Sequence, residues 1–171
     1  MEGRVGVSSI PGEGSTFWIE LEHVEYQKFL DESALSAPKR GTAEVLKSGT
    51  ILYFEDNVSN IELVDGIIEN YRPHIQLITS VSGINAVNLA KDSKPDLILL
   101  DLDLPEIHGS DVFINLQADP ETFSIPVVII SADAMTHQIK KMLKAGVKDY
   151  LTKPIEIAVF LKMVDKWIEK S

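Results

Sequence analysis

The chain has 171 residues, of which 44% are hydrophobic and 25% charged, and its formal net charge is -10. This length gives room for one well-cored domain and an appendage, since single domains usually run to about 100–150 residues. The acidic excess argues against nucleic acid as a partner and favours cations, because phosphate binding depends on clustered Lys and Arg. The absence of cysteine excludes disulfides and thiolate metal sites, which fits a cytoplasmic protein. No apolar run approaches the roughly 20 residues that cross a bilayer.

The first 24 residues contain two runs of strand-forming residues, Arg4 to Ser9 and Thr16 to Glu22. The segment between them is rich in Pro and Gly, which favour a turn, so we predict a β-hairpin. A lone hairpin is at best marginally stable in water. These residues are therefore expected to pack on something else or to be the remnant of a larger sheet.

Residues 25–48 contain a polar tract of small residues and are predicted to be a linker. Within this segment, Tyr26 to Leu35 show only a weak helical periodicity. The main domain is predicted to cover residues 49–171.

From Thr50 onward, short apolar runs alternate with amphipathic segments. Most runs are apolar on both faces, which is typical of parallel strands that are covered by helices on both sides. These runs are residues 51–54, 75–78, 97–100, 127–130 and 147–151. The amphipathic segments place apolar residues at helical spacing. Two of these faces consist of Ile61, Val64, Ile67, Ile68 and Tyr71, and of Phe160, Met163, Val164 and Trp167. Five such units predict a doubly wound α/β fold, with a five-stranded parallel sheet flanked by five helices.

Polar residues follow four of the predicted strands. In such a sheet the ligand crevice lies at the carboxyl ends of the strands. The residues there are Glu55 and Asp56 after the first strand, Asp101 and Asp103 after the third, Ser131 after the fourth and Lys153 after the fifth. Clustered carboxylates repel one another unless they share a cation, and ligands that are all oxygen suit a hard ion such as Mg²⁺. The pattern therefore predicts a magnesium site.

Each of these residues also has an ordinary structural explanation. Glu55 and Asp56 could cap the next helix, since acidic side chains favour a helix N-terminus. Ser131 could be a turn residue and Lys153 a solvated lysine. Asp101 is harder to explain in this way, because it follows an apolar strand directly and needs a partner at the edge of the core. The joint placement at four strand ends favours a functional site.

Several motifs resemble the receiver domain of bacterial two-component systems, in the same order along the chain. They are Glu55-Asp56-Asn57 with Asn60, the run from Pro95 to Leu102, Leu104-Pro105 with Gly109, Ser131-Ala132, and Asp149 to Ile155. The match covers roughly residues 49–169. It implies the flavodoxin-like fold of that family.

The resemblance also implies a role for each site residue. Asp101 is expected to accept a phosphoryl group, and Glu55, Asp56 and Asp101 are expected to hold Mg²⁺ together with the backbone carbonyl of Asp103. Lys153 is expected to contact the phosphoryl group. Ser131 and Tyr150 are expected to act as the switch pair.

Three further positions bear on the resemblance. The family implies a cis peptide bond before Pro154, and proline is the residue that makes a cis bond cheap. Glu55 replaces the commoner aspartate, and its longer reach is compatible with metal binding through water. His108 stands where the family often has aspartate, outside the inner site.

The N-terminal segment resembles the closing hairpin of the ATP-binding domain of sensor histidine kinases, through Gly3 to Ser9 and Pro11 to Trp18. This resemblance covers about the first 22 residues. The nucleotide-binding asparagine and glycine boxes of that family are not in the sequence, so no ATP binding is expected. In hybrid histidine kinases the end of the kinase domain is followed by a linker and then by a receiver domain. The chain is therefore interpreted as the C-terminal part of such a protein.

The receiver resemblance implies transfer of a phosphoryl group from the phosphohistidine of a histidine kinase to Asp101. The signal would then pass to a histidine phosphotransfer domain or another protein. One alternative is a haloacid-dehalogenase-type phosphatase, which the motif Asp101-Leu102-Asp103 also resembles, although that family has its nucleophile after the first strand. Another alternative is a degenerate receiver that serves only for docking. The competent residue at every site position argues against this alternative. The alternating apolar residues of the hairpin could dock on the receiver, pair with a second copy of the chain or fray in solution. Exposed strand edges favour the second of these outcomes, a homodimer.

Overall fold

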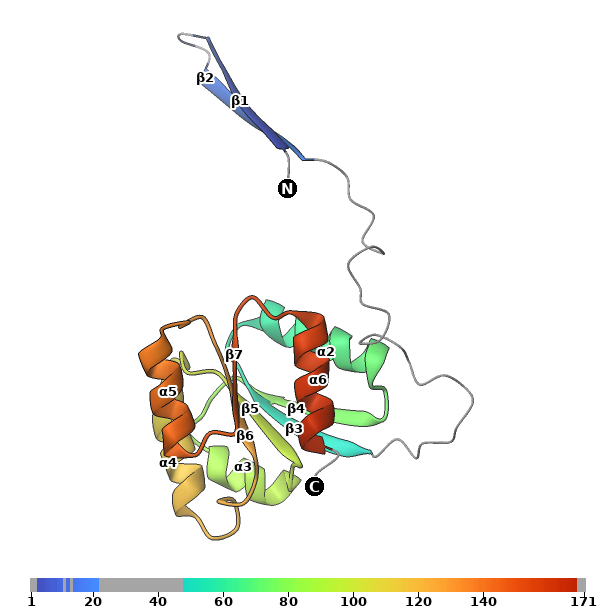
Figure 1. Ribbon diagram of the computed structural model, residues 1–171, viewed down its shortest axis with the longest axis vertical. Helices are drawn as coiled ribbons and strands as arrows, with labels where there is room; N and C mark the ends of the chain where they lie inside the picture. Colours follow the sequence, from blue (N-terminus) through green and yellow to red (C-terminus); the bar gives the residue numbers. More distant parts are fainter. Residues whose placement is uncertain (1–2, 11, 13, 22–47, 169–171) are drawn as a thin grey trace. The chain divides into compact units, whose positions relative to one another are not determined.

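A computed structural model describes residues 3–10, 12, 14–21 and 48–168 of the chain. These residues form two separate units, an N-terminal hairpin and an α/β domain (Figure 1). The linker predicted over residues 25–48 and the weak helical segment from Tyr26 to Leu35 lie outside the described residues, apart from Ser48. None of the described helices is long and apolar enough to cross a membrane.

The N-terminal unit is the predicted hairpin. Strand β1 (Gly3–Ile10) pairs antiparallel with β2 (Gly14–Leu21). Gly12 and Gly14 have φ angles of 86° and 111°, which L side chains rarely adopt and which the tight turn requires. One face of the hairpin consists of the exposed pairs Val5↔Ile19 and Val7↔Phe17. The hairpin therefore presents a row of apolar side chains to its surroundings.

The α/β domain consists of five strands that alternate with five helices, as predicted. The elements are β3 (Gly49–Phe54), α2 (Val58–Tyr71), β4 (Ile75–Ser80), α3 (Ala86–Ser93), β5 (Leu97–Leu100), α4 (Gly109–Ala118), β6 (Val127–Ser131), α5 (Thr136–Ala145), β7 (Asp149–Thr152) and α6 (Ile157–Ile168). All four strand pairs are parallel, in the order β4-β3-β5-β6-β7. This is the flavodoxin-like order, so the doubly wound fold is confirmed.

The last strand begins later than predicted. Gly146 ends α5 with a φ of 111°, and the Val147 amide donates to the carbonyl of Met142 at 3.2 Å. Val147 therefore belongs to the helix C-cap, although it is buried as an apolar strand residue would be. The strand pairs only from Asp149 onward.

Alternate residues of the central strands point to two hydrophobic cores, one on each face of the sheet. Ile51, Tyr53 and Leu99 face a core formed with α2 and α6, and Leu52 and Leu100 face a core formed with α3, α4 and α5. Figure 1 shows α2 and α6 on one side of the sheet and the other three helices on the opposite side. Because both faces are covered, the polar residues at the strand ends are left at the rim of the sheet.

The start of α4 packs directly on the backbone that follows β5. The Gly109 amide donates to the carbonyl of Leu102 at 2.9 Å, and a Cβ atom at Gly109 would collide with the backbone of Asp101 and Leu102. A glycine is therefore required here by close approach and not by its φ angle. This contact fixes the loop that carries Asp101.

We expect Gly109→Ala to destabilise the domain by about 1–3 kcal/mol, the cost of overpacking a well-filled site. Gly66→Ala is the matched control, since a Cβ at Gly66 in the middle of α2 meets nothing within 4 Å. That control should stabilise the domain by about 1 kcal/mol, the helix propensity difference. Urea denaturation of both variants tests this prediction, and equal stability changes of the same sign would contradict the packing argument.

Candidate functional site

The candidate site lies where the strand order reverses, between β3 and β5. Backbone hydrogen bonds continue past the strand ends, so that the Asp101 amide donates to Phe54 O at 3.0 Å and the Lys153 amide donates to Ser131 O at 2.8 Å. The residues predicted from four separate strands are thereby brought to the same edge of the sheet. In open α/β sheets this reversal point is where ligands bind.

The α2 helix is capped by Asn57 and not by the acidic pair that precedes it. The Asn57 side-chain oxygen accepts from the amides of Ser59 at 2.9 Å and Asn60 at 3.4 Å. The helix-capping explanation of Glu55 and Asp56 is therefore unnecessary. Their carboxylates are available for another role.

Three carboxylates gather at the reversal point. Glu55, Asp56 and Asp101 each offer an oxygen, and these oxygens lie within 4.8 Å of one another. Glu55 and Asp101 are buried, whereas Asp56 is exposed. A set of oxygen ligands with one exposed side fits a hard divalent cation that keeps part of its water shell, such as Mg²⁺.

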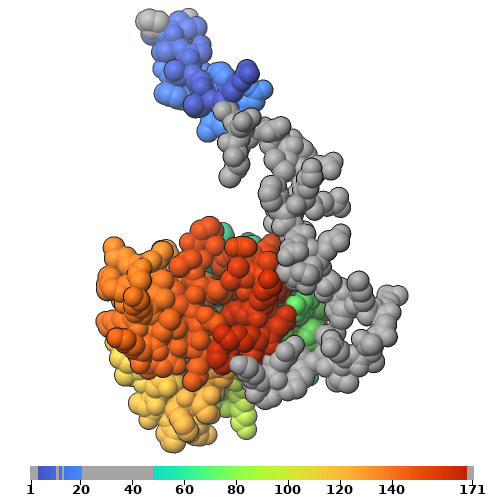
Figure 2. All heavy atoms as spheres, in the orientation of Figure 1, coloured from blue at the N-terminus to red at the C-terminus, as the bar shows by residue number. Residues whose placement is uncertain are grey.

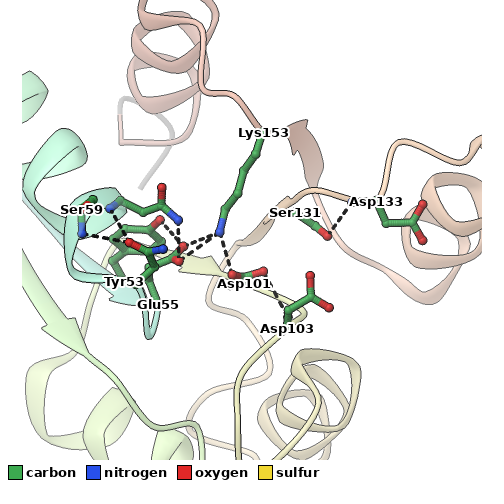
Figure 3. A network of polar contacts seen from close by, with 10 residues as sticks. Tyr53, Glu55, Ser59, Asp101, Asp103, Ser131, Asp133 and Lys153 are labelled. Carbon is green, nitrogen blue, oxygen red and sulfur yellow. Dashed lines mark hydrogen bonds and ion pairs between the residues drawn. The ribbon is translucent and has the colours of Figure 1, made fainter. Parts of the chain in front are cut away.

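Lys153 connects the two buried carboxylates (Figure 3). Its ammonium nitrogen lies 2.7 Å from Asp101 Oδ2 and 2.7 Å from Glu55 Oε2. Burial lowers the pKa of Lys153, but the bonds to Asp101 and Glu55 outweigh this effect and hold the pKa above its usual value. The side chain is therefore a permanent cation at the centre of the site.

Asp101 is held from two directions. Lys153 donates to one carboxylate oxygen, and the Asp103 amide donates to the other at 3.1 Å. Burial raises the pKa of Asp101 even though both donors act in the opposite direction. The carboxylate is thus oriented while it remains poorly solvated, as suits a nucleophile that needs a fixed geometry.

Glu55 has two further donors, Tyr53, which the sequence did not assign to the site, and Asn60, which belongs to the receiver motif but was given no role there. Tyr53 donates its hydroxyl to Oε2 at 2.7 Å, and Asn60 donates its side-chain amide to Oε1 at 2.8 Å. Burial alone would raise the pKa of Glu55, but the hydrogen bonds from Asn60, Lys153 and Tyr53 together lower it. Tyr53 precedes Glu55 by two residues, so strand periodicity places both side chains on the same face. That spacing was the available signal, but the apolar surroundings of Tyr53 indicated only a core aromatic.

The predicted switch residues lie next to this cluster. Ser131 is buried at the end of β6, and its Oγ accepts from the Asp133 amide at 3.1 Å. Tyr150 is partly buried and donates its hydroxyl to the carbonyl of Asp133 at 2.8 Å. Ser131 and Tyr150 are therefore joined through the same loop, which leads into α5. Burial raises the pKa of Tyr150, so its hydroxyl remains a donor at neutral pH.

The remaining expectations concern the rim of the site. Asp103 has an exposed side chain, and it is its backbone amide that contacts Asp101. His108 caps α4, because its Nδ1 accepts from the Ser110 amide at 3.2 Å, so its side chain is used at the start of that helix. The Lys153–Pro154 peptide bond is cis, as expected.

We expect Lys153→Met to destabilise the metal-free domain by about 3 kcal/mol at neutral pH, because two buried carboxylates lose their counter-charge. In this variant the pKa values of Glu55 and Asp101 rise, so the folded state binds protons that the unfolded chain does not. The deficit should therefore shrink as the pH falls from about 8 to about 5. Lys166→Met, which removes the more exposed pair with Asp149, should cost at most about 1 kcal/mol. Urea denaturation in the presence of a chelator measures both, and a pH-independent deficit for Lys153→Met would contradict the prediction.

Comparisons with known proteins agree with this geometry. The family model of the response regulator receiver domain matches residues 51–165. The polar-differentiation response regulator DivK of Brucella ovis is 33% identical over 119 residues, which cover 70% of this chain and 95% of DivK. The receiver domain of the sensor histidine kinase PA1611 from Pseudomonas aeruginosa, solved with a magnesium ion in its active-site cleft, is 27% identical with a TM-score of 0.64, over 72% of this chain and 99% of that domain.

A second solved structure belongs to a histidine kinase as well. The receiver domain of a signal transduction histidine kinase from Syntrophus aciditrophicus is 27% identical with a TM-score of 0.63, and the alignment covers 71% of this chain and 91% of that domain. The shared fold, the order of the motifs and the extent of the matched region lead to one conclusion. The chain belongs to the response regulator receiver domain family.

Proposed function

We propose that this receiver domain accepts a phosphoryl group on Asp101, with Mg²⁺ bound beside it, in a two-component phosphorelay. The observation that carries the proposal is the buried Asp101 carboxylate, oriented by Lys153 and Asp103 next to the acidic pair Glu55 and Asp56. Glu55, Asp56 and Asp101 would hold the metal together with the backbone carbonyl of Asp103. When bound, Mg²⁺ would supply positive charge that neutralises the oxygens of the phosphoryl group.

The reaction is a displacement at phosphorus. A carboxylate oxygen of Asp101 forms a bond to the phosphorus of a phosphohistidine, and the phosphorus–nitrogen bond breaks with its electron pair returning to the imidazole. The product is an acyl phosphate on Asp101. Lys153 already contacts Asp101, so its ammonium stands where the equatorial oxygens of a loose transition state gain charge.

The same residues suggest how phosphorylation would be read out. A phosphoryl group adds roughly −1.5 to −2 charge, and the Ser131 hydroxyl is a suitable donor to it. If Ser131 turned toward that group, its bond to the Asp133 amide would be lost, and the loop that also holds Tyr150 would change. The surface made by α5, β7 and α6, whose two helices face the viewer in Figure 2, would carry this change.

The phosphatase alternative is disfavoured by the position of the nucleophile. Asp101 follows β5, which is the third strand of its sheet along the chain, and the acidic pair follows β3, the first. In the phosphatase family the nucleophile would follow the first strand.

The proposed phosphoryl donor is the phosphohistidine of a histidine kinase. The proposed recipient is a histidine phosphotransfer domain or another protein.

The hairpin supports a further part of the proposal, namely that the chain is part of a hybrid histidine kinase. Val5, Val7, Phe17 and Ile19 have exposed fractions from 60% to 78%, as expected of a face that belongs in the core of another domain. Both solved relatives described above are receiver domains of histidine kinases. We therefore assign residues 1–24 to the end of an ATP-binding domain, residues 25–48 to a linker and residues 49–171 to the receiver.

We expect Asp101→Asn to abolish phosphorylation and leave the fold intact, because an amide cannot act as the nucleophile. Intact mass after treatment with acetyl phosphate and Mg²⁺ measures the adduct. Asp103→Asn is the matched control and should keep a normal yield, since the proposed role of Asp103 uses its backbone carbonyl. A phosphate adduct of normal yield on Asp101→Asn would mean that another residue is the acceptor.

We expect removal of residues 1–24 to shift any dimer of the chain toward monomer, because the exposed apolar face of the hairpin is lost. Phosphorylation of Asp101 should be unchanged, since every site residue lies beyond Gly49. Sedimentation of both chains, with intact mass as the second measurement, tests the assignment. Loss of folding or of the acyl phosphate would show that the hairpin is an integral part of the receiver.

A further inference from the structure

The Glu55 carboxylate accepts four hydrogen-bond contacts. Its Oε1 accepts from Asn60 at 2.8 Å and from Lys153 at 3.0 Å, and its Oε2 accepts from Tyr53 at 2.7 Å and from Lys153 at 2.7 Å. An ionised carboxylate has about four lone-pair positions. Glu55 therefore uses its full acceptor capacity, half for Lys153 and half for the other two donors (Figure 3).

The three donors differ in how firmly they are held. Tyr53 is fully buried in β3, in the core shared by α2 and α6, and its ring cannot move without disturbing that core. Asn60 lies in the first turn of α2, whose start is fixed by the Asn57 cap. Lys153, by contrast, reaches the site through a flexible four-carbon chain and also contacts Asp101. Glu55 thus has two fixed donors and one movable donor.

We propose that Tyr53 and Asn60 are positioning residues that hold the Glu55 carboxylate in place whether or not Lys153 contacts it. Tyr53 uses one acceptor position of Oε2, and Asn60 uses one acceptor position of Oε1. Each oxygen therefore keeps a second acceptor position for another partner. Lys153 uses both of these positions in the structure. With Mg²⁺ bound, as in the proposed function on which this inference rests, these two positions would serve to hold the metal.

The same arrangement gives a reason for glutamate at this position. The carboxylate of an aspartate at position 55 would lie one methylene closer to the main chain. The buried Tyr53 hydroxyl would then lose the carboxylate that it contacts. A buried hydroxyl without a partner is costly, because it has given up its bonds to water. Tyr53 and Glu55 therefore form a matched pair, because the glutamate side chain is long enough for its carboxylate to accept the Tyr53 hydroxyl hydrogen bond.

The first test is the Mg²⁺ affinity of the full chain, measured by calorimetry. Tyr53→Phe keeps the buried ring and removes only the hydroxyl, and it should weaken Mg²⁺ binding roughly tenfold, as loss of a residue that orients a metal ligand does. Asn60→Ala, at a partly exposed helix position, should weaken it to a similar extent and serves if Tyr53→Phe folds poorly. Tyr71→Phe is the matched control, because Tyr71 packs against the same core from the far end of α2. It should leave the affinity unchanged.

The second test uses the metal-free chain and does not depend on Mg²⁺. Tyr53→Phe should lower the melting temperature in the wild-type background, where it breaks the bond to Glu55. In the Glu55→Asp background the same substitution should leave the melting temperature unchanged or raise it, because it then removes an unpaired buried hydroxyl.

The outcomes separate this inference from the proposed function. Failure of the wild-type chain to bind Mg²⁺ would overturn the metal site and the positioning role with it. Normal wild-type binding together with unchanged affinity in both Tyr53→Phe and Asn60→Ala would overturn the positioning role alone. Equal melting-temperature losses from Tyr53→Phe in the two backgrounds would overturn the pairing of Tyr53 with Glu55.

Discussion

Two carboxylates buried at the ends of neighbouring strands cannot both stay charged without a cation between them. Glu55 and Asp101 are in this position, and Lys153 supplies the cation by contacting both of them at 2.7 Å. Ion pairs of this kind are costly to break, because either partner is left buried and unpaired. The amide of Asp103 serves the same requirement, because it donates to the Asp101 oxygen that Lys153 does not contact.

The requirement also makes the site responsive. A single lysine that neutralises two carboxylates can be replaced by another cation or can follow a newly bound anion, because its side chain is long and flexible. On the proposed function, Mg²⁺ brings positive charge into the cluster and the phosphoryl group brings negative charge of similar size. The protein can then redistribute its contacts among Glu55, Asp101 and Lys153 without moving the sheet, since the backbone bonds at the strand ends hold the frame.

The sheet and its helices decide how firmly each part of the site is held. Glu55 is supported from inside the core by Tyr53 and from α2 by Asn60, and the Asp101 loop is supported by the close contact with Gly109. Ser131 and Tyr150, in contrast, are connected through a loop that leads into α5, a helix with one buried residue, Met142. The residues proposed for the chemistry are therefore held by contacts from several elements, whereas the residues proposed to report it are connected through one loop.

Much of this protein could be read from the amino-acid sequence. Continuous apolar runs alternating with amphipathic segments determined the doubly wound sheet, and the polar residues after four strands, Asp101 among them, marked the edge at which the site lies. These features are local, so spacing and residue type were enough to find them. The hairpin turn was found in the same way, from its Pro and Gly.

The tertiary structure decided what depends on contacts between distant segments. The start of β7 was placed too early because Val147 is apolar like a strand residue, and only its bond to Met142 shows that it belongs to a helix cap. Likewise, Tyr53 has the sequence signature of a core aromatic, and only the folded chain brings its hydroxyl to the carboxylate that Lys153, 98 residues beyond Glu55, also contacts. A pattern along the chain records which face a residue occupies, but hydrogen-bond partners are set by the packing of whole elements.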